Sequence, residues 1–423
     1  MTEVFKFGGA SVKDAAGVKN LSQIVKANPE KQLLIVVSAM GKTTNNLEKL
    51  TYAYINGSTS LQEIFTSIKD YHEGILNELF EDKTNPVFDD IANTFIEIDW
   101  IIEDEPHEDF DFIYDQIVSI GELVSSKIVS AYLNSLGISN KWLDARSFIL
   151  TDNTYREGQV NWDKTCKTIQ GQFTNILSKN SIVTQGFIGG TSENYTTTLG
   201  REGSDYSAAI FASCLKADAV TIWKDVPGVL NADPKLFPGT VKYDELTYGE
   251  ALEMAYYGAS IIHPKTIKPL QNAGIPLFVK PFLSPLEKGT IVSGRVEPGI
   301  PAPAIIVKKQ QALLSLTTKD ASFITENHLS RLFRLFADNH IKINVMQNSA
   351  ISFSVCLDWD ENRFKQLQEL LQEEYNLRYN TQLELITIRH FNSKLIEELT
   401  AGKTILLEQY SRLTAQLVLK NLS

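Results

Sequence analysis

Apolar, β-branched runs alternate with stretches of helical periodicity along most of the chain, and a glycine follows each run within a few residues. The clearest runs are 4–7, 33–37, 182–185 and 219–223. Alternation of short buried strands with helices is typical of an α/β fold, with a mainly parallel sheet flanked by helices. We therefore expect ligands to bind beyond the carboxyl ends of the strands, where the glycine loops lie.

The stretch of about 61–120 departs from this rhythm. Its apolar residues recur with a helical period, it is acidic between residues 81 and 111, and it contains little glycine. We interpret it as a helical insertion whose acidic face is solvated.

The pattern changes again after residue 303. Strand and helix signals follow in the order βαββαβ, which is the ferredoxin-like arrangement, and a shorter, incomplete copy follows. The expected elements are strands 313–316, 343–346, 351–357 and 383–388 with helices 324–339 and 362–374, then a helix near 395–399 and strands 405–408 and 414–419. The segment 294–303 holds three prolines and two glycines and is predicted to link a domain of 1–295 to a region of 304–423.

The charge balance narrows the choice of partners. The chain has 423 residues, which is more than one hydrophobic core usually supports, so two or more domains are expected. Its net charge is -11. An acidic chain repels nucleic acid and anionic membranes, so we expect neither as a main partner. An anionic substrate would then need a locally basic site.

Cysteine usage and the N-terminus indicate a cytoplasmic protein. Cys166, Cys214 and Cys356 are far apart in sequence and lack the spacing of a metal site, so we predict reduced thiols. The N-terminus lacks the layout of a signal peptide, and no apolar run is long enough to span a bilayer.

A lysine and two glycines mark the end of the first predicted strand. Lys6 offers a charge for phosphate oxygens, and Gly8 and Gly9 let backbone N–H groups approach them. The alternative is an ordinary strand-to-helix turn. Gly41-Lys42-Thr43 is not a P-loop, because Val36 stands where that motif requires glycine.

The block from Thr196 to Ala209 is the most informative. Its glycine-rich loop opens a helix, and a helix start offers N–H donors to an anion. Arg201 can bind a carboxylate with two bonds, and Asp205 can orient a lysine or a metal-bound water. Ser204 or Asp205 is also expected to cap the helix.

Two isolated residues leave alternatives open. Glu122, in a helical pattern after the insertion, could accept from a substrate ammonium group or be an ordinary solvated residue. His263, before Pro264, is interpreted as a helix-entry residue rather than a catalyst. A helix is expected from there to Gly274, and another after Thr247, which begins a capping-box spacing.

Taken in order, these motifs resemble those of the aspartate kinases, members of the amino acid kinase family. The resemblance covers nearly the whole chain to about Ile291, and the segment 339–358 is similar to an ACT regulatory domain. The motifs that carry it are KFGGASV, VVSAMGKTTNNL, SIGELVS, TQGFIGG, TTTLGREGSDYSAA, IWKDVPGVLNADPK and GASIIHPKTI.

The resemblance implies transfer of a phosphoryl group from MgATP to the β-carboxylate of L-aspartate, the first step of lysine, threonine and methionine biosynthesis. The magnesium would be carried by the nucleotide. By position, Lys6 and Asp205 would be catalytic. The aspartate site would comprise Ser38, Thr44, Glu122, Arg201 and Ser204. The nucleotide site would comprise Lys6, Phe7, Gly8, Gly9, Lys224, Asp225, Leu230, Lys235 and Ser260.

The chain also departs from the family pattern. Ser260 stands where the family often has a lysine, for which Lys265 or Lys224 could compensate, and Leu230 and Lys235 replace a tyrosine and an arginine. Two alternatives follow: a kinase of the same fold acting on acetylglutamate, glutamate or a nucleoside monophosphate, or a catalytically weak amino-acid sensor. An amino-acid effector and homodimerisation through unpaired sheet edges are further expectations.

Overall fold

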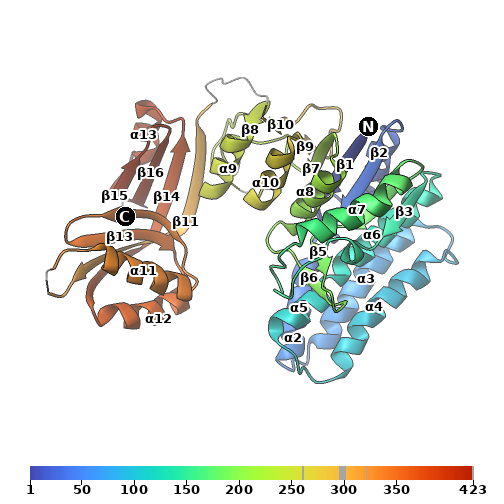
Figure 1. Ribbon diagram of the computed structural model, residues 1–423, viewed down its shortest axis with the longest axis horizontal. Helices are drawn as coiled ribbons and strands as arrows, with labels where there is room; N and C mark the ends of the chain where they lie inside the picture. Colours follow the sequence, from blue (N-terminus) through green and yellow to red (C-terminus); the bar gives the residue numbers. More distant parts are fainter. Residues whose placement is uncertain (260–261, 295–301, 321, 422–423) are drawn as a thin grey trace. The chain divides into compact units, whose positions relative to one another are not determined.

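The computed structural model describes residues 1–259, 262–294, 302–320 and 322–421. The chain divides into two compact units (Figure 1). The first contains Met1–Val229, Lys242–Leu252 and Ser260–Glu297, and the second contains Leu230–Val241, Glu253–Ala259 and Pro298–Ser423.

An eight-stranded sheet forms the centre of the first unit, in the order β3-β4-β2-β1-β7-β9-β10-β8. All neighbours are parallel except β9 and β10. The four predicted apolar runs are its central strands and are almost wholly buried, as expected for strands covered on both faces. The strands are β1 (Thr2–Phe7), β2 (Gln32–Val37), β3 (Asn140–Leu143), β4 (Ser181–Gln185), β7 (Ala219–Lys224), β8 (Glu245–Thr247), β9 (Leu277–Pro281) and β10 (Thr290–Ser293).

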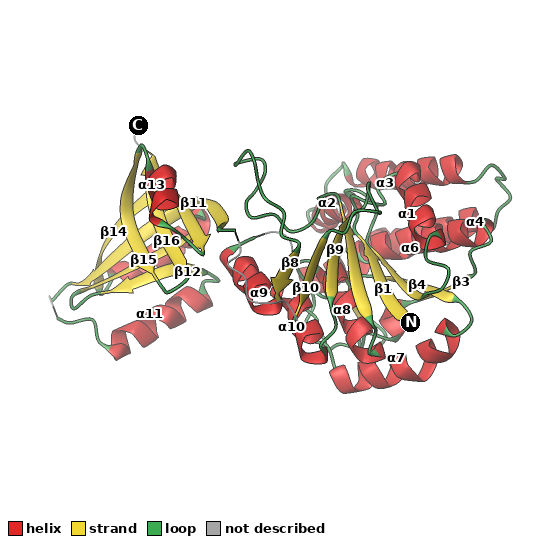
Figure 2. Ribbon diagram, turned by 90° about the horizontal axis from the view of Figure 1, so that it is seen from above, coloured by secondary structure: helices red, strands yellow, loops and turns green. Residues whose placement is uncertain are grey.

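Helices cover both faces of this sheet (Figure 2), which confirms the predicted α/β class. The layer on one face consists of α7 (Trp162–Leu177), α8 (Gly203–Leu215) and α10 (Pro264–Ala273). The other face is covered by α1 (Ala15–Lys26) and α6 (Ile120–Ser135). The remaining elements are α2 (Thr43–Ile55), α3 (Leu61–Leu79), α4 (Val87–Glu103), α5 (Phe110–Val118), the 3-10 helix Ala145–Ser147, the hairpin of β5 (Ile188–Gly190) and β6 (Thr196–Thr198), and α9 (Tyr248–Tyr257).

The local helix signals are confirmed. The predicted insertion consists of three helices, α3 to α5. The hydroxyl of Thr247 accepts a hydrogen bond from Glu250 N at 3.1 Å at the start of α9. His263 caps α10 by accepting from Lys265 N at 3.1 Å, and α10 ends at Gly274 with φ 66°.

The second unit contains a six-stranded antiparallel sheet in the order β12-β13-β11-β14-β16-β15. Its elements follow the predicted βαββαβ order and then add a helix and two strands. They are β11 (Ala304–Thr318), α11 (Glu326–Asp338), β12 (Ile343–Asn348), β13 (Ser352–Asp358), α12 (Glu361–Gln372), β14 (Tyr375–Arg389), α13 (Ser393–Thr400), β15 (Lys403–Tyr410) and β16 (Thr414–Asn421). Helices α11 and α12 pack on an apolar cluster of β11 and β13, centred on Leu314 and Val355.

Two strands of this sheet are much longer than the sequence predicts. β11 and β14 pair along both halves, with register shifts between Lys308 and Gln311 and between Gln311 and Leu313. Gln310 adopts φ 54° at this irregularity. The apolar run 304–307 opens β11 but was not predicted as a strand, and the bulge separates it from the predicted strand 313–316. The predicted linker, 294–303, lies mostly outside the described residues.

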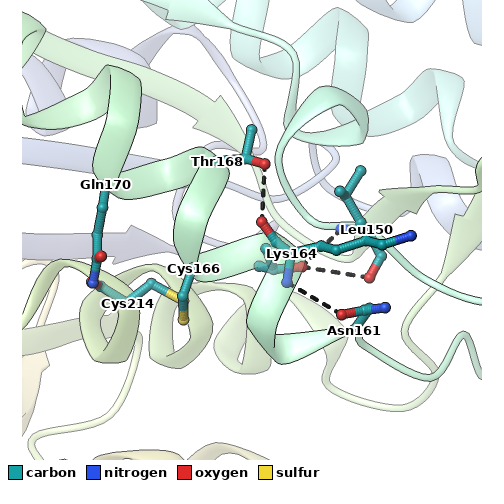
Figure 3. The surroundings of a disulfide bond; sticks show 8 residues. Leu150, Asn161, Lys164, Cys166, Thr168, Gln170 and Cys214 are labelled. Carbon is teal, nitrogen blue, oxygen red and sulfur yellow. Dashed lines mark hydrogen bonds between the residues drawn. A yellow bond between two sulfur atoms is a disulfide. The ribbon is translucent and has the colours of Figure 1, made fainter.

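The prediction of three reduced thiols is wrong for two of them. Cys166 of α7 and Cys214 of α8 form a disulfide (Figure 3), while Cys356 is a free, buried thiol. The two cysteines lie 48 residues apart in sequence, but α7 and α8 pack side by side on the sheet. Spacing along the chain does not report this proximity, because it arises from tertiary packing. No helix among the described residues has the length and apolar character needed to cross a membrane.

Candidate active site

Four loops meet at the carboxyl ends of the central strands. After β1, Gly9 lies so close to the loop after β2 that a Cβ would stand 2.5 Å from the carbonyl oxygen of Ala39. After β4, a Cβ on Gly186 would stand 2.5 Å from the Cβ of Ser204, at the start of α8. Glycine is needed at both places because any side chain would push the loops apart. The close approach assembles the predicted motifs at one edge of the sheet.

A buried carboxylate lies between two lysines at this edge. Asp205 Oδ1 lies 2.6 Å from the Nζ of Lys6 on β1, and its Oδ2 lies 3.3 Å from the Nζ of Lys224 at the end of β7. Burial disfavours ionisation of Asp205, but the two lysines outweigh it and lower its pKa. The carboxylate therefore stays ionised and fixes two cations side by side, an arrangement suited to phosphate oxygens.

Glu122, on the first turn of α6, is a second buried carboxylate in a different setting. It is 2% exposed. Its Oε1 accepts one long hydrogen bond, 3.3 Å from Ala39 N, and its Oε2 is buried with no hydrogen-bond partner among the described residues. Burial raises the pKa of Glu122 to about 8, although this hydrogen bond and the nearby Lys6 act in the opposite direction. The interpretation of Glu122 as an ordinary solvated residue is therefore wrong.

The start of α8 lies close to the lysines, because Asp205 in its first turn pairs with both of them. Glu202 occupies the N-cap position with φ 54° and makes no side-chain capping bond. The expectation that Ser204 or Asp205 caps the helix is wrong, because both lie in its first turn and Asp205 is engaged by lysines. Arg201 precedes the helix and is exposed, so its guanidinium can reach a ligand.

Four further predicted residues follow the central strands or lie at their ends. Ser38 follows β2, and Thr44 lies in the first turn of α2; both are partly exposed. Asp225 follows Lys224 and is exposed. The Phe7 side chain is fully buried, with its ring 6.1 Å from that of Trp223, so only its backbone can face a ligand.

The structure does not test three of the predicted nucleotide residues. Leu230 and Lys235 belong to the second unit. Ser260 lies outside the described residues. In the described part of the chain, no three acidic, histidine or cysteine side chains gather as metal ligands, and Asp205 is already bound by lysines. These residues do not fit a metal ion held by the protein itself.

Several residues that support the site were not predicted. Within the insertion, Tyr71 donates its hydroxyl to the carbonyl of Lys13, and the buried His72 lies 3.3 Å from the hydroxyl of Thr43, at the start of α2. The fully buried Asp115 of α5 accepts hydrogen bonds from residues near Arg201. No sequence motif marks these residues, although an acid between apolar residues, as in IYDQIV, is a signal that could have found Asp115.

Comparisons with known proteins agree with this geometry. The sequence model of the amino acid kinase family matches residues 1–281. Lysine-sensitive aspartokinase 3 of Escherichia coli (strain K12) is 30% identical over 355 residues, which are 84% of this chain and 78% of that protein. Chloroplastic aspartokinase 2 of Arabidopsis thaliana is 30% identical over 387 residues, 88% of this chain and 69% of that protein. The crystal structure of E. coli aspartokinase III with aspartate and ADP superposes with a TM-score of 0.85 and 26% identity, covering 99% of this chain and 96% of that chain.

Proposed function

The chain belongs to the aspartokinases of the amino acid kinase family, and we propose that it transfers the γ-phosphoryl group of ATP to the β-carboxylate of L-aspartate. The observation that carries this proposal is the pairing of two unlike buried carboxylates at one edge of the sheet. Asp205 holds two cations, and Glu122 has an oxygen that no described residue bonds. A substrate with an anionic reacting group and an ammonium group matches both.

On the phosphoryl side, Lys6 and Lys224 would neutralise the charge of the group in transfer. The amides of Gly8 and Gly9 and the start of α8 add N–H donors. The β-carboxylate of aspartate is already a nucleophile, so no general base is needed. Catalysis then rests on alignment and on charge stabilisation, as in other phosphoryl transfers.

On the aspartate side, Glu122 would accept from the ammonium group and Arg201 would bind a carboxylate. Such charge-assisted contacts are stronger than neutral hydrogen bonds and fix the orientation of the substrate. Ser38, Thr44 and Ser204 border the same edge and would complete the site with hydroxyl groups.

Nucleotide binding is supported by the E. coli structure that contains ADP. We propose that Asp225, Leu230, Lys235 and Ser260 contribute to it, together with Phe7 through its backbone. Magnesium would be bound by the nucleotide phosphates, since the described residues do not form a protein-held metal site.

We further propose that residues 1–295 form the catalytic domain and 304–423 an ACT-like regulatory region. One relative is named as lysine-sensitive, which supports an amino-acid effector of this kind. β12 and β15 are the outer strands of the second sheet and would allow a homodimer to form by edge pairing, which light scattering can test. We also propose that the enzyme is cytoplasmic and acts at the head of lysine, threonine and methionine biosynthesis.

An aspartyl-hydroxamate assay with purified protein and MgATP tests the proposal. We expect hydroxamate to form from L-aspartate and not from glutamate or acetylglutamate, with ADP released in equal amount. Repeating the assay with added lysine and with threonine identifies the effector. Turnover of another acid would assign the chain to a different kinase of the fold, and binding of aspartate without turnover would make it a sensor.

A further inference from the structure

Asp115 is a fully buried carboxylate of α5 that accepts three hydrogen bonds. Its Oδ2 accepts from the backbone N of Arg156 at 2.8 Å and of Thr198 at 2.9 Å. Its Oδ1 accepts from the hydroxyl of Thr198 at 2.7 Å. A single side chain thus connects α5, the loop before α7 and the strand β6.

The two segments that Asp115 holds border Arg201. Thr198 ends β6, three residues before Arg201. Gly200 lies between Thr198 and Arg201 in the sequence. A Cβ on Gly200 would stand 3.4 Å from the carbonyl oxygen of Arg156. The loop of Arg201 is therefore supported by both partners of Asp115.

Arg156 is held on α5 by its side chain as well. Its guanidinium lies 4.5 Å from the ring centre of Tyr114 and 3.3 Å from Asp111 Oδ1. Its φ of 65° is unusual for a residue with a side chain. Such a backbone persists where neighbouring contacts fix it, and here α5 provides them.

The same backbone segment also carries Glu122. α5 ends and α6 begins at Ser119, and Glu122 follows Asp115 by seven residues. We propose that Asp115 is a positioning residue that sets the Arg201 loop at a fixed distance from Glu122, so that the site fits both charged ends of aspartate. This inference rests on the proposed function, in which Glu122 and Arg201 bind that substrate.

An uncharged residue cannot replace Asp115 in this role. Burial raises the pKa of Asp115 to about 6, even though its hydrogen bonds lower it. At the pH of a kinase assay near 8 it is therefore an anion with acceptor sites for three donors. An asparagine can keep its oxygen on the two backbone N–H donors and turn its NH2 group to the Thr198 hydroxyl, but it lacks the negative charge, so each of these bonds becomes a weaker, neutral one.

The test is Asp115→Asn in the full-length chain. We expect the KM for aspartate to rise about tenfold or more, because the Arg201 loop is held less firmly, while the KM for ATP stays within about twofold. Asp152→Asn is the matched control. Asp152 accepts from Thr154 and Gln159 within the same loop but makes no bond to α5 or β6, so its loss should leave the KM for aspartate within about threefold.

Other outcomes overturn the inference. An Asp115→Asn protein with an unchanged KM for aspartate, or with equal increases for both substrates, would show that Asp115 does not position Arg201. An equal effect of Asp152→Asn would assign the loss to loop stability alone. If Asp115→Asn does not fold, Thr198→Val decides, because it removes only the hydroxyl bond. It should raise the KM for aspartate about threefold, and an unchanged value contradicts the proposal. Failure of the proposed function is distinct, since the unaltered protein would then not phosphorylate aspartate.

Discussion

The two buried carboxylates of the active site are opposites in their surroundings. Asp205 is 3% exposed and lies between two lysines, which lower its pKa. Glu122 is 2% exposed, has an oxygen without a hydrogen-bond partner among the described residues, and has a pKa raised to about 8. The Asp205 pocket contains its two cations before any ligand binds, whereas no cation of the described residues is bonded to Glu122.

This difference follows from what each pocket has to do. A phosphoryl group in transfer is anionic, so its pocket needs fixed positive charge, and Asp205 holds that charge in place. An amino-acid substrate brings its own ammonium group, so its pocket needs an unpaired acceptor. Burying such an acceptor destabilises the free protein, and the bound substrate removes that cost.

Removing a cation from the Asp205 pocket should have the largest effect. We expect Lys6→Met to lower kcat by about a thousandfold, as when a charge-stabilising donor is removed from other active sites. The apolar stem of the side chain is kept, so packing changes little. Steady-state kinetics with saturating ATP and aspartate measure the effect.

Lys31→Met is the matched control for this substitution. Lys31 also pairs with a carboxylate, Glu3 at 3.0 Å, but at the opposite end of β1 from the site. Its loss should leave kcat within about twofold. If Lys6→Met does the same, the lysine pair has no part in phosphoryl transfer.

The Glu122 pocket should respond to pH instead. Below pH 8 the free protein holds a proton on Glu122, and the ammonium group binds only after that proton leaves. The KM for aspartate should therefore rise about tenfold for each pH unit below 8, about a hundredfold between pH 8 and pH 6, and level off above. Initial rates at several pH values measure this slope.

Glu122→Gln isolates the cause of the slope. Its KM for aspartate should be high, by about tenfold to a hundredfold at pH 8, and independent of pH. Glu122 also has a higher pKa in the folded protein, about 8, than in an unfolded chain, 4.5. Between these pH values the unfolded chain loses this proton while the folded protein keeps it, so the free energy of unfolding falls as the pH rises. The melting temperature of the Gln variant should therefore rise relative to the unaltered protein from pH 5 to pH 9. A pH slope retained in the variant would contradict the role of Glu122.

The contrast between the carboxylates was only partly predictable from the sequence. Lys6 interrupts an apolar strand just before two glycines, and Asp205 follows a glycine-rich loop, so both carry local signals. Parallel strands bring such strand ends to one edge, which is why the proximity of Lys6 and Asp205 could be predicted. Glu122 had only a resemblance to support it, because burial depends on α2, β2 and α6 packing together.

Features that depend on distant partners were not predictable. The donors of Asp115 lie 41 and 83 residues away in sequence. The first half of β11 was missed because the bulge at Gln310 separates it from the strand that was predicted. The disulfide joins cysteines whose proximity follows from the packing of α7 on α8. In each case the deciding contact is tertiary.

The disulfide at the far end of α8 offers a further test of the difference between the Asp205 and Glu122 pockets. Of the changes considered, its loss should have the smallest effect on turnover. Cys214 lies in the last turn of α8, and Asp205 lies in the first turn of the same helix. Helix α6, which carries Glu122, lies on the other face of the sheet. Closing a loop of this length stabilises a fold by about 4 kcal/mol in the chain-entropy account. We therefore expect reduction, or Cys166→Ser, to lower the melting temperature of the catalytic unit.

The effect on catalysis should be small and confined to one pocket. Asp205 and Cys214 lie nine residues apart on α8, about 13 Å along the helix axis, so loosening one end leaves the other held by the lysines. We expect kcat to fall less than about threefold on reduction, with the KM for aspartate unchanged. Cys356→Ala is the control, because this thiol makes no disulfide and its variant should respond to reductant as the unaltered protein does. A KM for aspartate that changes more than kcat would show that the two pockets share one support, and the contrast between them would then fail.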